Sequence, residues 1–237
     1  MTPTTAQARP ASAGPGTRMT RLLLTGGMVG PVLFLIVLLI EGATRPGYSA
    51  WRQFGSELSL SSQGWEQVAN FLMCGVLCLG FAVGLRRALG GGRGAIAGPV
   101  ALAVFGTALL VAGIFKTDPG LGYPPGVPTP SSPTPHGAVH ALAGLFVFVS
   151  LTVACIALAR RFAGNARWRG WALYSVVTGV IVLLSLVFCN VAANQIIDGT
   201  QPNAPAGLLQ RVGIVAGWVW IALLATRLLR MTRPAAA

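Results

Sequence analysis

Six apolar stretches of about 20 residues each constrain the fold of this 237-residue chain more than any other feature. An α-helix rises 1.5 Å per residue, so about 20 residues cross a hydrocarbon core of about 30 Å. A helix also satisfies its backbone hydrogen bonds internally, as lipid demands. The sequence therefore predicts an all-α polytopic membrane protein, a bundle of six transmembrane helices within residues 22–230, at about 22–40, 68–85, 95–115, 138–159, 171–192 and 212–229.

Composition agrees with a membrane environment and argues against nucleic acid. The chain is 54% hydrophobic and only 9% charged, which is too apolar for one soluble core of this size. Its formal net charge of +12 would suggest phosphate binding in a soluble domain. Here the basic residues lie between apolar stretches, where they set topology. We expect the lipid bilayer, and no nucleic acid, as the partner.

The distribution of charge predicts that both termini are cytoplasmic. Basic residues near membrane helices are retained on the cytoplasmic side. Thirteen of the seventeen fall on one side, before the first predicted helix, in the second and fourth connections and at the end of the chain: Arg9, Arg18, Arg21, Arg86, Arg87, Arg93, Arg160, Arg161, Arg167, Arg169, Arg227, Arg230 and Arg233. All five acids fall on the other side: Glu41, Glu57, Glu66, Asp118 and Asp198. We expect a multi-pass protein of a bacterial plasma membrane.

The segments outside the helices differ in character. Residues 1–21 are rich in Pro, Ala, Gly and Thr and are predicted to form a disordered cytoplasmic tail. Residues 231–237 form a second tail. The outer connection 116–137 contains seven prolines, which favour an extended and stiff backbone.

Small residues and cysteines point to packing. Pairs of glycines four apart let helix backbones approach, and a homodimer through these faces is the alternative to intramolecular packing. The pairs are Gly26 and Gly30, Gly80 and Gly84, and Gly213 and Gly217. The four cysteines lie inside predicted helices, so no disulfide framework is expected.

Polar residues near the outer helix ends form the candidate site. Intramembrane polar groups are costly and tend to find partners or to function. We therefore expect a shared outer pocket, formed by Glu57, Asn70, Asp118, His140, Asn190 and Asn194.

Asp118 and His140 allow three interpretations. Thr134 is predicted to cap the fourth helix with Pro135 in its first position. In the simplest interpretation His140 donates a hydrogen bond to Asp118 and clamps the proline-rich loop. A binding or pH-sensing site is the second. In the third, His136, His140 and Asp118 bind zinc and Glu57 acts as a base, as in membrane lipid hydrolases of the ceramidase type.

Four blocks of sequence resemble a known family. They are GSELSLSSQGWEQVANFLMCGVLCLGFAVGLRRAL, GIFKTDPGLGYPPG, TPHGAVHALAGLFVF and GLLQRVGIVAGWVWIALLATRLL. Together they are similar to the bacterial six-helix membrane family catalogued as domain of unknown function 998, over residues 22–230. That family is distantly similar to the Frag1 and autophagy-modulator membrane proteins, which implies a shared fold and no reaction. Lys116 departs from the expected small residue or Pro, so no role is carried over to it.

The resemblance implies no activity, and soluble-enzyme signatures such as a Walker loop or HExxH are absent from the sequence. The predicted function is a non-catalytic membrane protein with a polar binding or structural pocket on the outer side and no cofactor. The alternatives are a zinc-dependent lipid hydrolase and a small-solute transporter. Transport ranks below binding because the predicted helix centres carry no charge.

Overall fold

Six long α-helices make up most of the computed structural model, which describes residues 15–232. The helices are α1 (Pro15–Thr44), α2 (Trp65–Leu89), α3 (Ala97–Ile114), α4 (Pro135–Ala163), α5 (Arg169–Ile197) and α6 (Ala206–Met231). Two short 3₁₀ helices, η1 (Gly55–Leu60) and η2 (Ala166–Trp168), lie in the connections. No strand occurs within the described range, so the predicted all-α class is confirmed.

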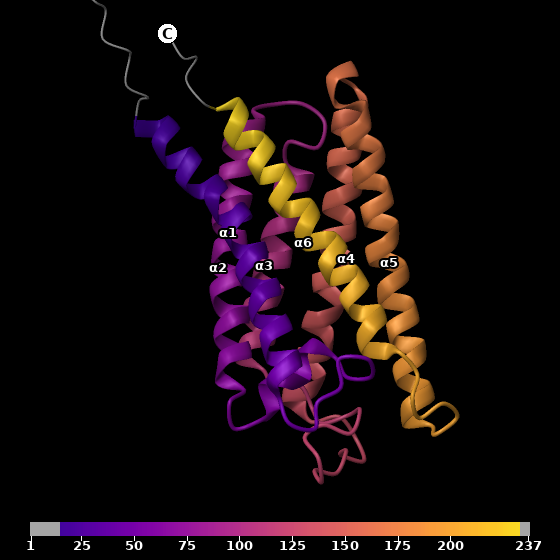
Figure 1. Cartoon of the computed structure of the whole chain (residues 1–237). Helices are drawn as coiled ribbons and strands as arrows, with labels where there is room; N and C mark the ends of the chain where they lie inside the picture. The colour runs from indigo at the N-terminus through magenta and orange to yellow at the C-terminus, as the bar shows by residue number, and fades with distance from the viewer. Residues whose placement is uncertain (1–14, 233–237) are drawn as a thin grey trace, which may run out of the picture.

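The helices form a closed ring. Each packs against the next one along the chain, and α6 packs back against α1. Both ends of the described chain lie at one end of the bundle (Figure 1). We call this end the termini-side face and the opposite end the distal face. The distal face carries the connections 45–64, 115–134 and 198–205.

All six helices are long and apolar enough to cross a membrane. Their most apolar windows have mean hydropathies between 1.9 and 2.5, yet only 39 to 56% of the residues in each window are buried inside the protein. The outward faces are therefore apolar as well, which suits contact with lipid on the outside of the ring.

The helices extend beyond most of the predicted spans because hydropathy marks the apolar centre of a helix and misses its polar end turns. Helix α1 begins at Pro15, so residues 15–21, assigned to a disordered tail, are helical. The rest of that predicted tail, 1–14, and residues 233–237 lie outside the described residues.

The glycine pairs serve packing within the chain. A Cβ added to Gly26 of α1 would lie 2.7 Å from the backbone oxygen of Leu77 in α2. One added to Gly213 of α6 would lie 2.3 Å from Ser185 Oγ in α5. These close approaches pack glycine faces against neighbouring helices of the same chain, and the homodimer stays a prediction. Residues of neighbouring elements also lie beside Gly30, Gly80, Gly84 and Gly217.

Aromatic side chains close the middle of the ring. Phe34 of α1 stacks on Trp218 of α6 with ring centroids 4.8 Å apart, and Phe105 of α3 meets the same indole edge-on at 5.2 Å. Further toward the termini, the fully buried Phe81 and Trp220 continue the packing. These side chains belong to one buried hydrophobic core in the middle of the bundle.

Candidate functional site: the distal cavity and its polar cap

A cavity of about 640 Å³ occupies the distal half of the ring, within the usual size range of ligand pockets. Residues of all six helices line it, with Trp218 and Phe34 among the aromatic side chains of its wall. No Asp, Glu, Lys or Arg is among the lining residues. The cavity is therefore mostly apolar, with polar but uncharged side chains at a few points.

The lining residues on α4 and α5 show where the cavity opens. Leu145 of α4 and Val187 of α5 both line the cavity, yet they are 47% and 49% exposed. Nearer the termini the two helices approach closely, since a Cβ on Gly179 would lie 3.1 Å from that of Cys155. The cavity thus opens sideways between the distal halves of α4 and α5, through the apolar surface that faces lipid.

His140 lines the cavity and is held by the end of α3. Its Nδ1 lies 2.7 Å from the carbonyl oxygen of Phe115 and 3.1 Å from that of Ala112. Carbonyl oxygens only accept, so Nδ1 carries the proton and Nε2 is left as an acceptor. The predicted hydrogen bond from His140 to Asp118 is therefore wrong, because the carbonyls at the end of α3 take the donor.

Asp118 instead clamps the proline-rich loop through Thr134. Its carboxylate accepts from the Thr134 backbone N at 2.8 Å and from Oγ1 at 2.6 Å. Thr134 Oγ1 in turn accepts from Gly137 N at 3.0 Å, and Pro135 is in the first turn, which confirms the predicted cap. A negative charge at the N-terminus of α4 is also favourable. The clamp exists, with Thr134 in the place expected for His140.

The predicted zinc ligands do not assemble. His136 is exposed, and its ring lies beside that of Phe115, 5.3 Å between centroids. Within residues 15–232 no three side chains of His, Cys, Asp or Glu lie close enough together to hold a metal ion. The geometry therefore gives no support to a zinc site at His136, His140 and Asp118.

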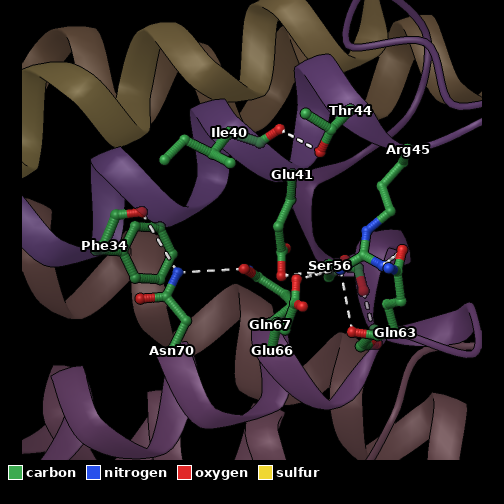
Figure 2. Close-up of polar contacts among 11 residues, drawn as sticks. Phe34, Ile40, Glu41, Thr44, Arg45, Ser56, Gln63, Glu66, Gln67 and Asn70 are labelled. Carbon is green, nitrogen blue, oxygen red and sulfur yellow. Dashed lines mark hydrogen bonds and ion pairs between the residues drawn. The ribbon is translucent and has the colours of Figure 1, made fainter.

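Gln67 of α2 is a lining residue of the cavity, and one of its two amide atoms is unpaired. Figure 2 shows its side chain beside that of Asn70. Its Oε1 accepts from Asn70 Nδ2 at 3.1 Å, and Asn70 also donates to the Phe34 carbonyl at 3.3 Å. Gln67 is fully buried, and its Nε2 has no hydrogen-bond partner among the described residues. An unsatisfied buried donor costs about 1–3 kcal/mol.

An ion-pair cluster with Arg45 buried at its centre joins the neighbouring ends of α1 and α2 (Figure 2). Arg45 Nη2 lies 3.2 Å from Glu41 Oε1 and 2.8 Å from Glu66 Oε2, and Nη1 donates to Gln63 Oε1. Arg45 is only 5% exposed. Sequence reasoning treated these charges as topology signals and missed the cluster, although the i, i+4 spacing of Glu41 and Arg45 was a usable signal.

We call the connection 45–64, whose residues Phe54, Gly55 and Ser56 line the cavity, its roof. Glu57 ties this roof to the proline-rich loop. Its carboxylate accepts from the backbone N of Phe54 at 2.9 Å, of Leu121 at 3.0 Å and of Gly120 at 3.3 Å. Glu57 is buried, and burial raises the pKa of its carboxyl above the ordinary value although the hydrogen bonds oppose the shift. These bonds tie η1 to the proline-rich loop. Glu57 does not line the cavity, so its geometry gives no support to a catalytic base.

Gln210 and Arg211 at the start of α6 anchor the same roof. Gln210 Oε1 accepts from Gly55 N at 2.8 Å. Arg211 Nη1 lies 3.0 Å from the carbonyl oxygens of Ala50, Gln53 and Gly207. The connection 45–64 is thereby fixed over the cavity, where its residues Phe54, Gly55 and Ser56 contribute to the lining.

The two asparagines of α5 are exposed. Asn190 lines the cavity at its mouth and donates to the Leu186 carbonyl of its own helix at 2.8 Å. The Asn194 side chain makes no hydrogen bond within residues 15–232. The six predicted site residues therefore do not form one pocket. His140 and Asn190 line the cavity, Asn70 supports Gln67, Glu57 and Asp118 fix loops, and Asn194 lies apart.

Comparison with known families agrees with the resemblance seen in the sequence. A family model described as "Protein of unknown function (DUF998)" matches residues 28–227, from within α1 to within α6. Comparisons with curated proteins and with solved structures give no match.

Proposed function

Because the chain belongs to the DUF998 family of proteins of unknown function, its function has to be argued from its own residues. We propose that it is a non-catalytic membrane protein that binds an uncharged, lipid-soluble molecule in the distal cavity. The observation that carries this proposal is a cavity of about 640 Å³ without charged lining residues that opens sideways between membrane-spanning helices.

The polar groups at the cavity define the ligand further. Gln67 and His140 line the cavity. Gln67 Nε2 has no partner among the described residues, and His140 Nε2 is left as an acceptor in the tautomer set by Phe115. A ligand that carries a carbonyl and a hydroxyl on an apolar body would satisfy both. Such a molecule dissolves in the bilayer and can enter through the mouth between α4 and α5.

The alternatives receive less support. A hydrolase of the ceramidase type would need the metal ligands that the described residues do not bring together. A transporter would need a path through the ring, and the middle of the ring is filled by the packed rings of Phe34, Phe105 and Trp218.

We further propose that both termini are cytoplasmic in a plasma membrane, as the charge distribution predicts. The distal cavity would then open into the outer leaflet.

The test is a variant that fills the cavity. Gly144 lines the cavity, and an added Cβ meets nothing within 4 Å. Gly144→Phe should therefore fold normally and occupy the space. Leu142→Phe is the matched control, since Leu142 is 53% exposed and does not line the cavity.

Wild type and both variants are purified in mild detergent, and their organic extracts and their retention of added dioleoylglycerol are compared by mass spectrometry. We expect retention of a lipophile to fall about tenfold or more in Gly144→Phe and to persist in the control. Equal lipophile content in all three proteins would contradict the proposal.

A further inference from the structure

A second cavity, of about 630 Å³, lies at the termini-side face between the ends of α2, α4 and α6. It shares no lining residue with the distal cavity. Its lining includes three arginines, Arg93, Arg160 and Arg161, and no acid. All five acidic residues of the chain lie at or near the distal face, so no carboxylate at this end balances the arginines.

The Arg161 guanidinium is engaged in hydrogen bonds to the backbone at the end of α2 and in the connection after it. It donates to the carbonyl oxygens of Leu89 at 2.6 Å, Gly91 at 2.9 Å and Arg93 at 3.1 Å. These bonds fix the connection 90–94 and therefore place the backbone of Arg93 at the rim of the cavity.

Arg93 and Arg160 remain available. Both side chains are exposed, and within residues 15–232 neither guanidinium takes part in a hydrogen bond or ion pair. Two such groups at one cavity match the oxygens of a phosphate ester, because guanidinium donors bind phosphate with charge-assisted and bidentate hydrogen bonds.

The rest of the cavity is apolar. Leu89, Leu228 and Met231 line it, and Phe162 stacks on Trp168 with ring centroids 4.7 Å apart. Arg227 lies 3.9 Å from the centroid of the Trp168 ring and helps to hold it. Retention of arginines on the cytoplasmic side accounts for their number. It does not account for unpaired arginines at the rim of a cavity with an apolar, aromatic wall.

We propose that this cavity binds the headgroup phosphate of an anionic phospholipid, with Arg93 and Arg160 on the phosphate and the acyl chain against the apolar wall. The site is independent of the proposed function of the distal cavity. Basic pockets between membrane helices are suited to such lipids because the headgroup carries the negative charge and the acyl chains of the same molecule are apolar.

The experiment measures binding of dioleoylphosphatidylglycerol to the full-length protein in detergent by native mass spectrometry. Dioleoylphosphatidylcholine and inorganic phosphate serve as comparison probes. The test variant is Arg93→Gln with Arg160→Gln. The matched control is Arg167→Gln with Arg169→Gln, which removes the same charge from the same face at exposed residues outside the cavity.

We expect the test variant to weaken binding of the anionic lipid about tenfold or more and the control to change it less than about twofold. Equal weakening by both pairs would overturn the proposal, since it would show a general effect of surface charge. Equal binding of the two lipids would overturn it as well. Binding of inorganic phosphate without the lipid would keep the phosphate chemistry and overturn the lipid assignment.

A second variant covers the case in which the arginine variant fails to fold. Ala163 is exposed and lines the cavity, so Ala163→Trp fills the space while all arginines remain. We expect the same loss of the anionic lipid. Wild-type binding by a folded Ala163→Trp protein would contradict a site inside the cavity.

Discussion

At the scale of single residues, the distal end is determined by which partner each polar group takes. His140 bonds to the end of α3, Asp118 bonds to Thr134, and Gln67 keeps one donor without a partner. The first two contacts stabilise the loops. The third leaves a buried donor unsatisfied, and a ligand acceptor would satisfy it in the proposed binding.

Gln67→Leu should separate binding from stability. It removes the unpaired Nε2 together with the acceptor of Asn70, which keeps its bond to the Phe34 carbonyl. We expect the free energy of unfolding to change by no more than about 1 kcal/mol, whereas the affinity for dioleoylglycerol falls about fivefold. Thermal unfolding with and without the added lipid measures both. A large loss of stability with unchanged affinity would show that Gln67 serves packing alone.

The partners of Asp118 can be tested with a double-mutant cycle. Asp118→Ala combined with Thr134→Ala should show a coupling energy of about 1–2 kcal/mol, because Thr134→Ala removes the hydroxyl that donates to the carboxylate and keeps the backbone N–H that also donates to it. Asp118→Ala combined with His140→Ala should be additive within about 0.5 kcal/mol. Unfolding midpoints in detergent supply the values. Stronger coupling to His140 than to Thr134 would restore the clamp that the sequence suggested.

At the scale of elements, buried polar contacts join the helix ends around the distal cavity. Arg45 joins α1 to α2, Arg211 joins α6 to the connection 45–64, and Glu57 joins η1 to the proline-rich loop. Each of these side chains bonds to a segment distant in sequence. The roof of the cavity is therefore stable only when several helices are already in place.

Arg45→Ala should be among the most damaging single changes at this end. It leaves the Glu41 carboxylate, 3% exposed, without its cation, and breaking a buried pair from one side costs about 3–5 kcal/mol. Thermal unfolding in detergent is the measurement. Arg52→Ala is the control, expected within about 0.5 kcal/mol of wild type, because within the described residues the Arg52 side chain makes no hydrogen bond or ion pair. Equal effects of both substitutions would contradict a structural role for the cluster.

Alkaline pH should lower the free energy of unfolding through ionisation of Tyr48. Its hydroxyl lies 3.1 Å from the Gln53 carbonyl oxygen and also pairs with Arg211, and burial raises the pKa of Tyr48 to about 12. The unfolded chain loses this proton near pH 10. The folded protein favours the neutral phenol, so this contribution to stability is complete below pH 10 and is lost as the pH rises through about 12.

The corresponding measurement is chemical unfolding between pH 9 and about 12. Wild type should lose stability more steeply over this range than Tyr48→Phe, which cannot ionise. Parallel profiles for the two proteins would show that the Tyr48 phenol has the same pKa in both states.

At the scale of the whole molecule, a ring of six helices has two separate cavities at opposite ends. The distal cavity has no charged lining residue, whereas the termini-side cavity is lined by three arginines and no acid. Their different chemistry follows the overall distribution of charge along the chain. The orientation in the membrane therefore decides which leaflet each cavity faces.

Cysteine labelling tests that orientation directly. The four native cysteines are buried, so single cysteines can be added without removing them. In intact cells a membrane-impermeant maleimide should label Ser131→Cys on the distal loop and leave Ala166→Cys unlabelled until the cells are lysed. Both positions are exposed. The reverse pattern would place the termini outside and contradict the positive-inside prediction.

The sequence by itself determined the six helices, their order and the cap of α4 by Thr134 and Pro135, because hydropathy and helix capping depend on residues close together in the chain. Only the tertiary structure decided that His140 bonds to α3, that Glu57 fixes a loop and that Gln67 faces a cavity. Those outcomes depend on pairs such as Glu57 and Leu121, which are 64 residues apart and meet only after the ring has closed. A cavity is likewise the space left by the packing of several helices, and no local pattern of residues encodes it.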